Sequence, residues 1–132
     1  MNIQPHKILV VIPDKRLREL IGEVITLLKH QPILLSNGNQ AISEFSNDKS
    51  IAVVVIDWEM TMKPFPDFVK EMSSISSYLG KFVLADMNDG EIRKHIEAGN
   101  FCCYTQKPFQ LEKFEKGLLG CINEYELAIK EL

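Results

Sequence analysis

Short apolar runs alternate with helically periodic segments five times along this chain, and no other feature constrains the fold as strongly. The runs indicate strands at 7–12, 32–36, 51–57, 81–86 and 101–105, and helical spacing is clearest at 14–30 and about 111–130. Strands that alternate with helices form a parallel sheet through right-handed crossovers, with helices on both faces. The sequence therefore predicts an α/β fold, a doubly wound five-stranded parallel sheet of the (βα)5 type.

Length and charge limit the kind of protein this is. The 132 residues suffice for one domain with a real core, which we place at 5–130. A net charge of −3 gives no sign of a nucleic-acid-binding surface. No apolar run reaches membrane-spanning length and the N-terminus is not a secretory signal, so we expect a cytoplasmic protein without membrane contact.

The cysteines and histidines show no pattern that predicts a site. Cys102, Cys103 and Cys121 form neither a disulfide framework nor a metal-ligand spacing, so we expect reduced thiols. The three histidines, at positions 6, 30 and 95, also lack a metal-ligand spacing, and solvent exposure is the default expectation for them.

Charged residues gather at the predicted strand ends. In parallel sheets the functional crevice lies at the carboxyl ends of the strands. Asp14 follows the first strand closely, Asp57 ends the third, Asp86 ends the fourth, and Lys107 follows the fifth. Three carboxylates and one ammonium group are therefore expected at one edge.

Four short motifs occur in a fixed order along the chain: KILVV at 7–11, SNGNQAI at 36–42, VIDWEM at 55–60 and YTQKPF at 104–109. Together they resemble the motifs of response-regulator receiver (CheY-like) domains, over nearly the whole chain from 7 to 129. The resemblance implies the flavodoxin-like strand order 2-1-3-4-5. It also implies that Asp57 is the phosphoacceptor, Lys107 the partner of the phosphoryl group and Tyr104 the switch aromatic residue.

The chemistry of that family depends on a metal ion. Asp57 would attack a phosphoryl group while Mg²⁺ and the lysine neutralise the charge that develops. The family holds Mg²⁺ with a pair of acids after strand one, but this sequence has Ile12 and Pro13 there. Asp14 and Glu59 are the substitute ligands available, and a Mg²⁺ site built on them with Asp57 would be weak or absent. We predict that Asp14 caps the following helix, near Leu17, instead.

A second departure is Asp86, where the family has Ser or Thr. An ionised carboxylate cannot donate a hydrogen bond and would repel a phosphoryl group. Two interpretations stay open: Asp86 pairs with Lys107 as a built-in anion, or it is a solvated loop acid.

The preferred function is a non-enzymatic, degenerate receiver that signals by binding proteins, with phosphorylation of Asp57 impaired or absent. The alternative is a working receiver that uses Asp57 with substitute Mg²⁺ ligands. A remote alternative is a flavodoxin-like cofactor binder, although the segment after strand one offers no phosphate loop.

The resemblance also implies partners. A histidine kinase or an effector would bind the face formed by the fourth helix (91–98), the strand with Tyr104 and the last helix. The last helix holds more apolar residues than one core-facing stripe accommodates, so some could serve such a partner or a homodimer.

Overall fold

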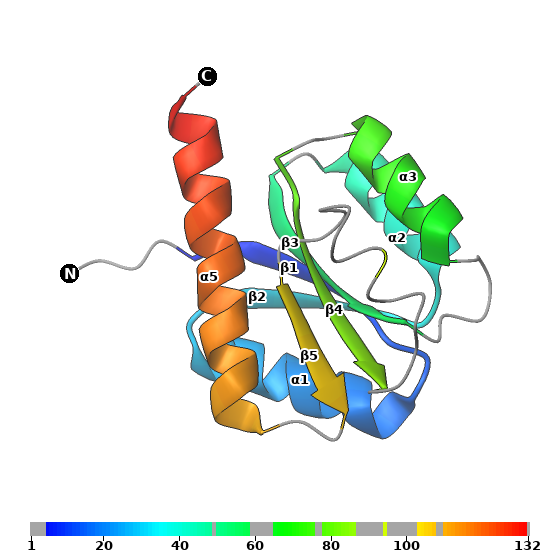
Figure 1. The fold of residues 1–132 in the computed structure, drawn as a ribbon, viewed down its shortest axis with the longest axis vertical. Coiled ribbons are helices and arrows are strands. Elements are labelled where there is room, and N and C mark those ends of the chain that lie inside the picture. The colour runs from blue at the N-terminus through cyan, green and yellow to red at the C-terminus, as the bar shows by residue number, and fades with distance from the viewer. Residues whose placement is uncertain are drawn as a thin grey trace.

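The structure is a computed structural model, and it describes residues 5–48, 50–58, 65–75, 78–86, 94, 103–107 and 110–131. Its elements follow in the order β1 (Lys7–Val11), α1 (Lys15–Leu27), β2 (Gln31–Leu35), α2 (Gly38–Asn47), β3 (Ile51–Asp57), α3 (Phe65–Ile75), β4 (Gly80–Asp86), β5 (Cys103–Lys107) and α5 (Leu111–Lys130). Figure 1 shows the strands side by side with α5 and α3 on opposite flanks.

The strands form one parallel sheet. Its order is β2-β1-β3-β4-β5, so the chain begins in the interior of the sheet and winds outward in both directions. The prediction of a flavodoxin-like parallel α/β sheet is confirmed, including the order of the first four strands. The fourth helix, which we expected at 91–98 and which a complete (βα)5 repeat requires, lies outside the described residues except for position 94.

The last strand ends two residues later than its prediction. We expected 101–105 from the apolar letters FCCYT, whereas β5 spans Cys103–Lys107, and 101 and 102 lie outside the described residues. Along this length β5 pairs with β4, with Phe82 level with Cys103 and Asp86 with Lys107. Gln106 and Lys107 are polar, so the apolar pattern did not include them. They belong to the strand because hydrogen bonding to the neighbouring strand, rather than side-chain burial, defines where a strand ends.

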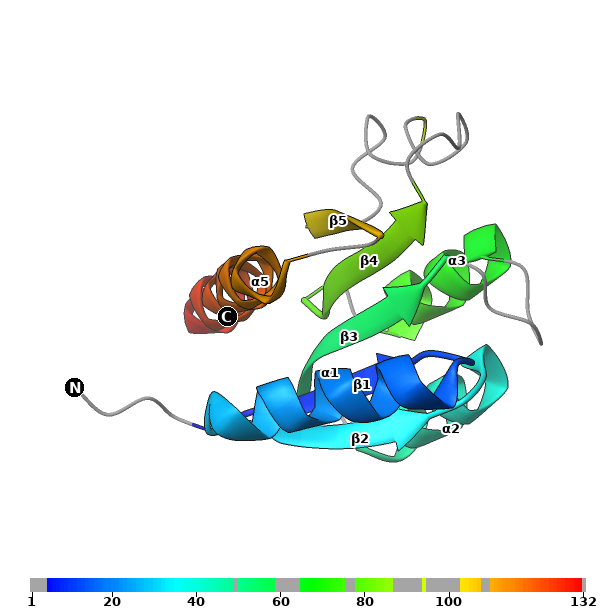
Figure 2. The same ribbon diagram turned by 90° about the horizontal axis from the view of Figure 1, so that it is seen from below.

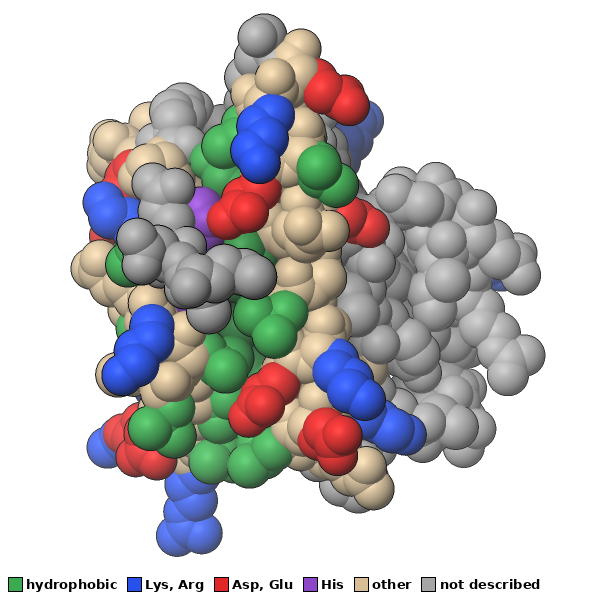
Figure 3. All heavy atoms as spheres, turned by 90° about the vertical axis from the view of Figure 1, so that its left-hand side faces the viewer, with side chains coloured by type: hydrophobic (Ala, Val, Ile, Leu, Met, Phe, Trp, Pro, Cys, Tyr) green, Lys and Arg blue, Asp and Glu red, His purple; other side chains and the backbone are tan. Residues whose placement is uncertain are grey.

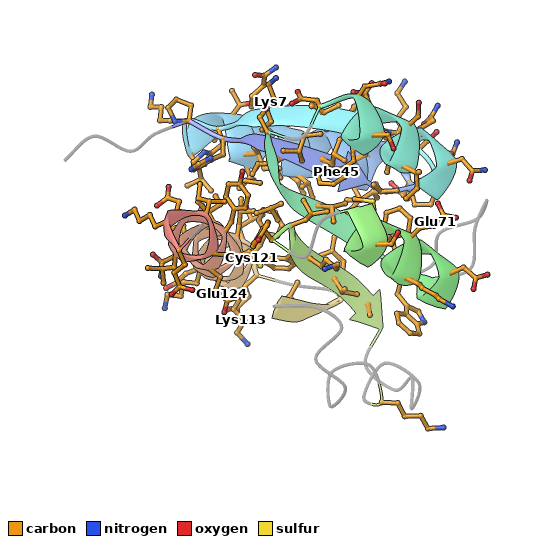
Figure 4. All side chains as sticks on the ribbon, turned by 90° about the horizontal axis from the view of Figure 1, so that it is seen from above. Lys7, Phe45, Glu71, Lys113, Cys121 and Glu124 are labelled. Carbon is orange, nitrogen blue, oxygen red and sulfur yellow. The ribbon has the colours of Figure 1, made fainter. Side chains whose placement is uncertain are left out.

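Two hydrophobic cores lie on the two faces of the sheet. Side chains alternate along each strand, so Ile8 and Val10 of β1 face one core while Leu9 and Val11 face the other. The first core is completed by α1 and α5, and the second by α2 and α3 (Figure 2). Phe45 of α2 points into the second core (Figure 4). β3 is buried along its entire length.

Asx side chains fix the starts of the first two helices. Asp14 caps α1, because its Oδ1 accepts from the Leu17 backbone N–H at 2.9 Å, as predicted. Asn37 caps α2 in the same way through the Gln40 N–H at 3.0 Å. Each helix therefore begins a few residues after a strand ends, which keeps the loops at this edge of the sheet short.

The expectation of three reduced thiols is wrong for Cys121, which is buried and disulfide-bonded. Since the chain has three cysteines, its partner is Cys102 or Cys103. Cys121 lies on α5, which packs on β4 and β5 (Figure 4). A disulfide requires proximity in space rather than a regular spacing, so the sequence pattern gave no signal for it.

The expected exposure of the histidines is also wrong for two of them. His30 is only 5% exposed, and the side chain of His6 is largely buried. Both lie where β1 and β2 begin, under the C-terminal half of α5. His95 lies outside the described residues. None of the described helices is long and apolar enough to cross a membrane.

Candidate functional site

Asp57 is the last residue of β3 and is 3% exposed. It is level with Leu84 of β4, and the Leu84 carbonyl accepts from the Trp58 backbone N–H at 2.9 Å. Burying a carboxylate at the end of an apolar strand costs free energy unless hydrogen bonds or an opposite charge compensate it. The side chain of Trp58 is partly buried against the core under α2 and α3.

Asp86 and Lys107 lie at the same edge of the sheet as Asp57. They are level with each other at the ends of β4 and β5, two residues beyond Leu84. The backbone thus brings the three predicted residues to adjacent strand ends. The side chains of Asp86, Lys107 and Tyr104, and all of Glu59, lie outside the described residues, so their proposed roles stay predictions.

The end of β1 is apolar where the receiver motif has acids. Val11 is level with Ile56, so Ile12 and Asp57 directly follow that pair on adjacent strands. Ile12 is fully buried, and its N–H donates to the Leu35 carbonyl at 3.1 Å. Neither Ile12 nor Pro13 has a side-chain oxygen. The position beside Asp57 is therefore part of the hydrophobic core.

A positive charge lies against the same strand end. From the first turn of α1, the Arg18 guanidinium donates through Nη1 to the Ile12 carbonyl at 2.7 Å and to the Pro13 carbonyl at 3.1 Å. These bonds hold the cation over the β1–α1 turn. The sequence alone does not show that the Arg18 side chain folds back onto the turn.

The described residues do not fit a Mg²⁺ ion at this edge. Mg²⁺ prefers oxygen ligands in octahedral geometry, usually with one or two carboxylates. Asp14 is exposed and caps α1, Ile12 and Pro13 offer no side-chain ligand, and Arg18 adds a positive charge. Within the described part of the chain, no group of three or more His, Cys, Asp and Glu side chains could hold a metal ion.

The fold is similar to that of solved response-regulator receiver domains. A receiver domain protein from Clostridium thermocellum is 19% identical, with a TM-score of 0.85 over 93% of this chain and 98% of that one. The signal receiver domain of an HD domain-containing protein from Pseudomonas fluorescens Pf-5 is 14% identical, with a TM-score of 0.89 over 100% and 97%. The non-phosphorylated HemR receiver domain from Leptospira biflexa is 24% identical, with a TM-score of 0.74 over 90% and 94%.

A scan of protein-family models and a search of curated proteins found no match for this sequence. The likeness to the solved structures is one of fold. What happens at Asp57 has to be argued from the residues around it.

Proposed function

We propose that this chain is a pseudo-receiver, a non-enzymatic cytoplasmic signalling module that works through protein contacts without Mg²⁺-dependent phosphorylation of Asp57. The observation that supports this most is the end of β1. Ile12, which is buried, and Pro13 stand where the receiver motif has two acids, and the Arg18 guanidinium is bonded to the backbone carbonyls of both.

Without a bound Mg²⁺ ion, phosphoryl transfer to Asp57 is electrostatically unfavourable. Phosphoryl transfer to a carboxylate brings negative charges together, and Mg²⁺ ordinarily offsets their repulsion. A site with one buried carboxylate and a fixed guanidinium at the adjacent strand end binds a divalent cation poorly, because the two cations repel each other. Arg18 bears only one charge and offers no open coordination position, so it does not replace the metal in phosphoryl transfer.

The experiment is the intact mass of the protein after incubation with acetyl phosphate and millimolar Mg²⁺. We expect no gain of a phosphoryl group. As a matched positive control, the double variant Ile12→Asp, Pro13→Asp restores both acids. A phosphoryl adduct on the wild type that disappears in Asp57→Asn would refute the proposal and support a working receiver. Asp14→Asn and Glu59→Gln would then identify the substitute ligand.

Partner binding is proposed for the side of the molecule that includes α5. Its inner face is used in the core through Phe114, Leu118, Cys121 and Ile122. Leu111, Leu119, Leu127 and Ile129 remain exposed along the same helix. Figure 3 shows hydrophobic side chains gathered beside this helix. Exposed apolar surface of this kind is typical of protein contacts, so we propose a histidine kinase or an effector as the partner, with a homodimer as the alternative.

Leu127 provides a direct test of this surface. It is 54% exposed, and Leu20 on α1 is 42% exposed, so the two leucines form a matched pair. If α5 mediates a homodimer, light scattering of the wild type at high concentration gives a dimer mass. Leu127→Ser then gives a monomer, whereas Leu20→Ser stays dimeric. A wild type that is monomeric throughout excludes the homodimer and leaves the kinase or effector.

A further inference from the structure

A groove of about 580 Å³ lies between α1 and β2, the strand at one edge of the sheet. Figure 2 shows α1 lying along β2. Side chains of α1 form one wall of the groove, and Pro32 and Leu34 of β2 form the other. Since α5 packs on β3, β4 and β5, this surface is separate from the exposed leucines of α5.

The floor of the groove is apolar because α1 approaches β2 closely at Gly22. A Cβ on Gly22 would lie 3.0 Å from Leu34 Cδ2, so the Leu34 side chain lies directly against the helix there. The hydroxyl of Thr26 is already used, because it donates to the Gly22 carbonyl at 3.0 Å. Leu34 is 41% exposed and Leu27, on the wall formed by α1, is 78% exposed. Two large apolar side chains that border one groove are typical of a protein-contact surface.

Glu19 and Glu23 add two negative charges to the α1 wall. They are four residues apart, so they are neighbours on the helix surface, and like charges at this spacing destabilise a helix. Neither carboxylate makes an ion pair with any of the described residues. Lys15 and Arg16, in the first turn of α1, are exposed and do not line the groove. A ligand with two positive charges therefore relieves the repulsion between these glutamates.

The edge of β2 favours a helix over an added strand. The Gln31 N–H donates to, and the Leu35 carbonyl accepts from, the residues that flank β1, at 2.9 Å and 3.1 Å. Backbone groups alternate in direction along a strand, so those of Pro32 and Leu34 point to the free edge. Proline has no N–H, and an additional strand would therefore lack a hydrogen bond at this position.

We infer that this groove binds an amphipathic helix of a partner protein, with an apolar stripe beside two Lys or Arg residues spaced four apart. The apolar side chains of that helix lie between Leu27 and Leu34, and its two cations lie against Glu19 and Glu23. Grooves of this kind recognise a helix through side chains that share one of its faces. Binding here does not involve Asp57, so its failure would leave the pseudo-receiver proposal unaffected.

The probe is a capped peptide of about 15 residues, long enough to form a helix. It is made of Leu, Ala and Lys, with the leucines on one face and two lysines four apart beside them, and a second peptide has Glu in place of both lysines. Each is titrated into ¹⁵N-labelled full-length protein while the amide signals are followed by NMR. We expect saturable shifts at 19–27 and 33–35 with the basic peptide and none with the acidic one. No saturable shift with the basic peptide, shifts confined to other surfaces, or equal binding of the acidic peptide overturns the proposal.

A pair of double variants separates the groove from the net charge of the protein. Glu19→Gln with Glu23→Gln removes two exposed ion pairs to the peptide, so the dissociation constant should rise about fivefold. Glu44→Gln with Glu124→Gln removes the same charge at exposed positions on α2 and α5, and it should leave the constant nearly unchanged. An equal loss in both double variants would mean that net charge alone attracts the peptide, which contradicts the proposal.

The apolar half of the contact is tested at Leu27. Its exposure makes Leu27→Ser harmless to the fold, and the loss of its apolar contact should raise the dissociation constant of the basic peptide about tenfold. Leu119→Ser on α5, where the leucine is 45% exposed, is the matched control and should bind like the wild type. Light scattering without peptide tests the other occupant. A dimer that Leu27→Ser dissociates and Leu119→Ser does not would show that the groove holds a second copy of this chain, and would overturn the proposal.

Discussion

Replacing Asp14 by Ala separates a helix cap from a metal ligand. In the structure the Asp14 carboxylate accepts from the Leu17 N–H at 2.9 Å and lies at the positive end of the α1 dipole. Loss of an N-cap acceptor costs about 1 kcal/mol of unfolding free energy. Because Asp14 is exposed, its charge interaction with the dipole adds only about 0.3–1 kcal/mol.

Urea unfolding measures this cost. With a urea dependence of about 2 kcal/mol per molar, the combined loss of about 1.3–2 kcal/mol in Asp14→Ala lowers the midpoint by roughly 0.7–1 M. The matched variant Asp14→Asn keeps the acceptor and loses only the charge, so its midpoint should fall by roughly 0.2–0.5 M. Neither shift should depend on millimolar Mg²⁺.

Two results would refute this account of Asp14. One is an Asp14→Ala midpoint equal to that of the wild type, which would mean that the carboxylate does not cap α1. The other is a wild type that Mg²⁺ stabilises while Asp14→Ala is not stabilised. Ligand binding to the native state raises its stability in that way, so this result would identify Asp14 as a metal ligand.

Three further predictions concern pH, backbone entropy and the disulfide. Burial lowers the pKa of His30 in the folded state, so below about pH 6.5 the unfolded chain binds more protons than the folded one. The urea midpoint should therefore fall as the pH drops from 6.5 towards the folded-state pKa. A midpoint that does not change with pH contradicts this. Gly120→Ala should raise the unfolding free energy by about 0.5–1 kcal/mol in urea titrations, because alanine loses less backbone entropy on folding than a glycine in mid-helix. The added Cβ meets nothing within 4 Å, so no clash opposes this gain, and a decrease would reveal a contact. Alkylation of denatured, unreduced protein should modify one of its three cysteines, and modification of all three would exclude the Cys121 disulfide.

The parallel sheet could be predicted from the sequence because burial of a strand and capping of a helix each require particular residue types. The run 51–56 is apolar since β3 is buried on both faces, and Asp14 precedes α1 because helix N-termini need an acceptor. Asp57, Asp86 and Lys107 could be placed at one edge because parallel strands end together.

The sequence could not predict the features that depend on three-dimensional proximity. His6 and His30 are 24 residues apart in the sequence, and His6 and Glu126 are 120 residues apart. They meet only because β1, β2 and α5 converge at one edge. The Arg18 contacts depend on a long side chain that folds back over its own turn, which no residue spacing specifies.

The fluorescence of Trp58, the single tryptophan, directly follows events at Asp57, its neighbour in the chain. The titration uses Mg²⁺ and then beryllofluoride, a stable mimic of the acyl phosphate, and the double variant Ile12→Asp, Pro13→Asp serves as the positive control. We expect a flat wild-type trace and a saturable response in the double variant. A saturable wild-type response to both at millimolar Mg²⁺, abolished by Asp57→Asn, would contradict the pseudo-receiver and show that the phosphorylation site is intact.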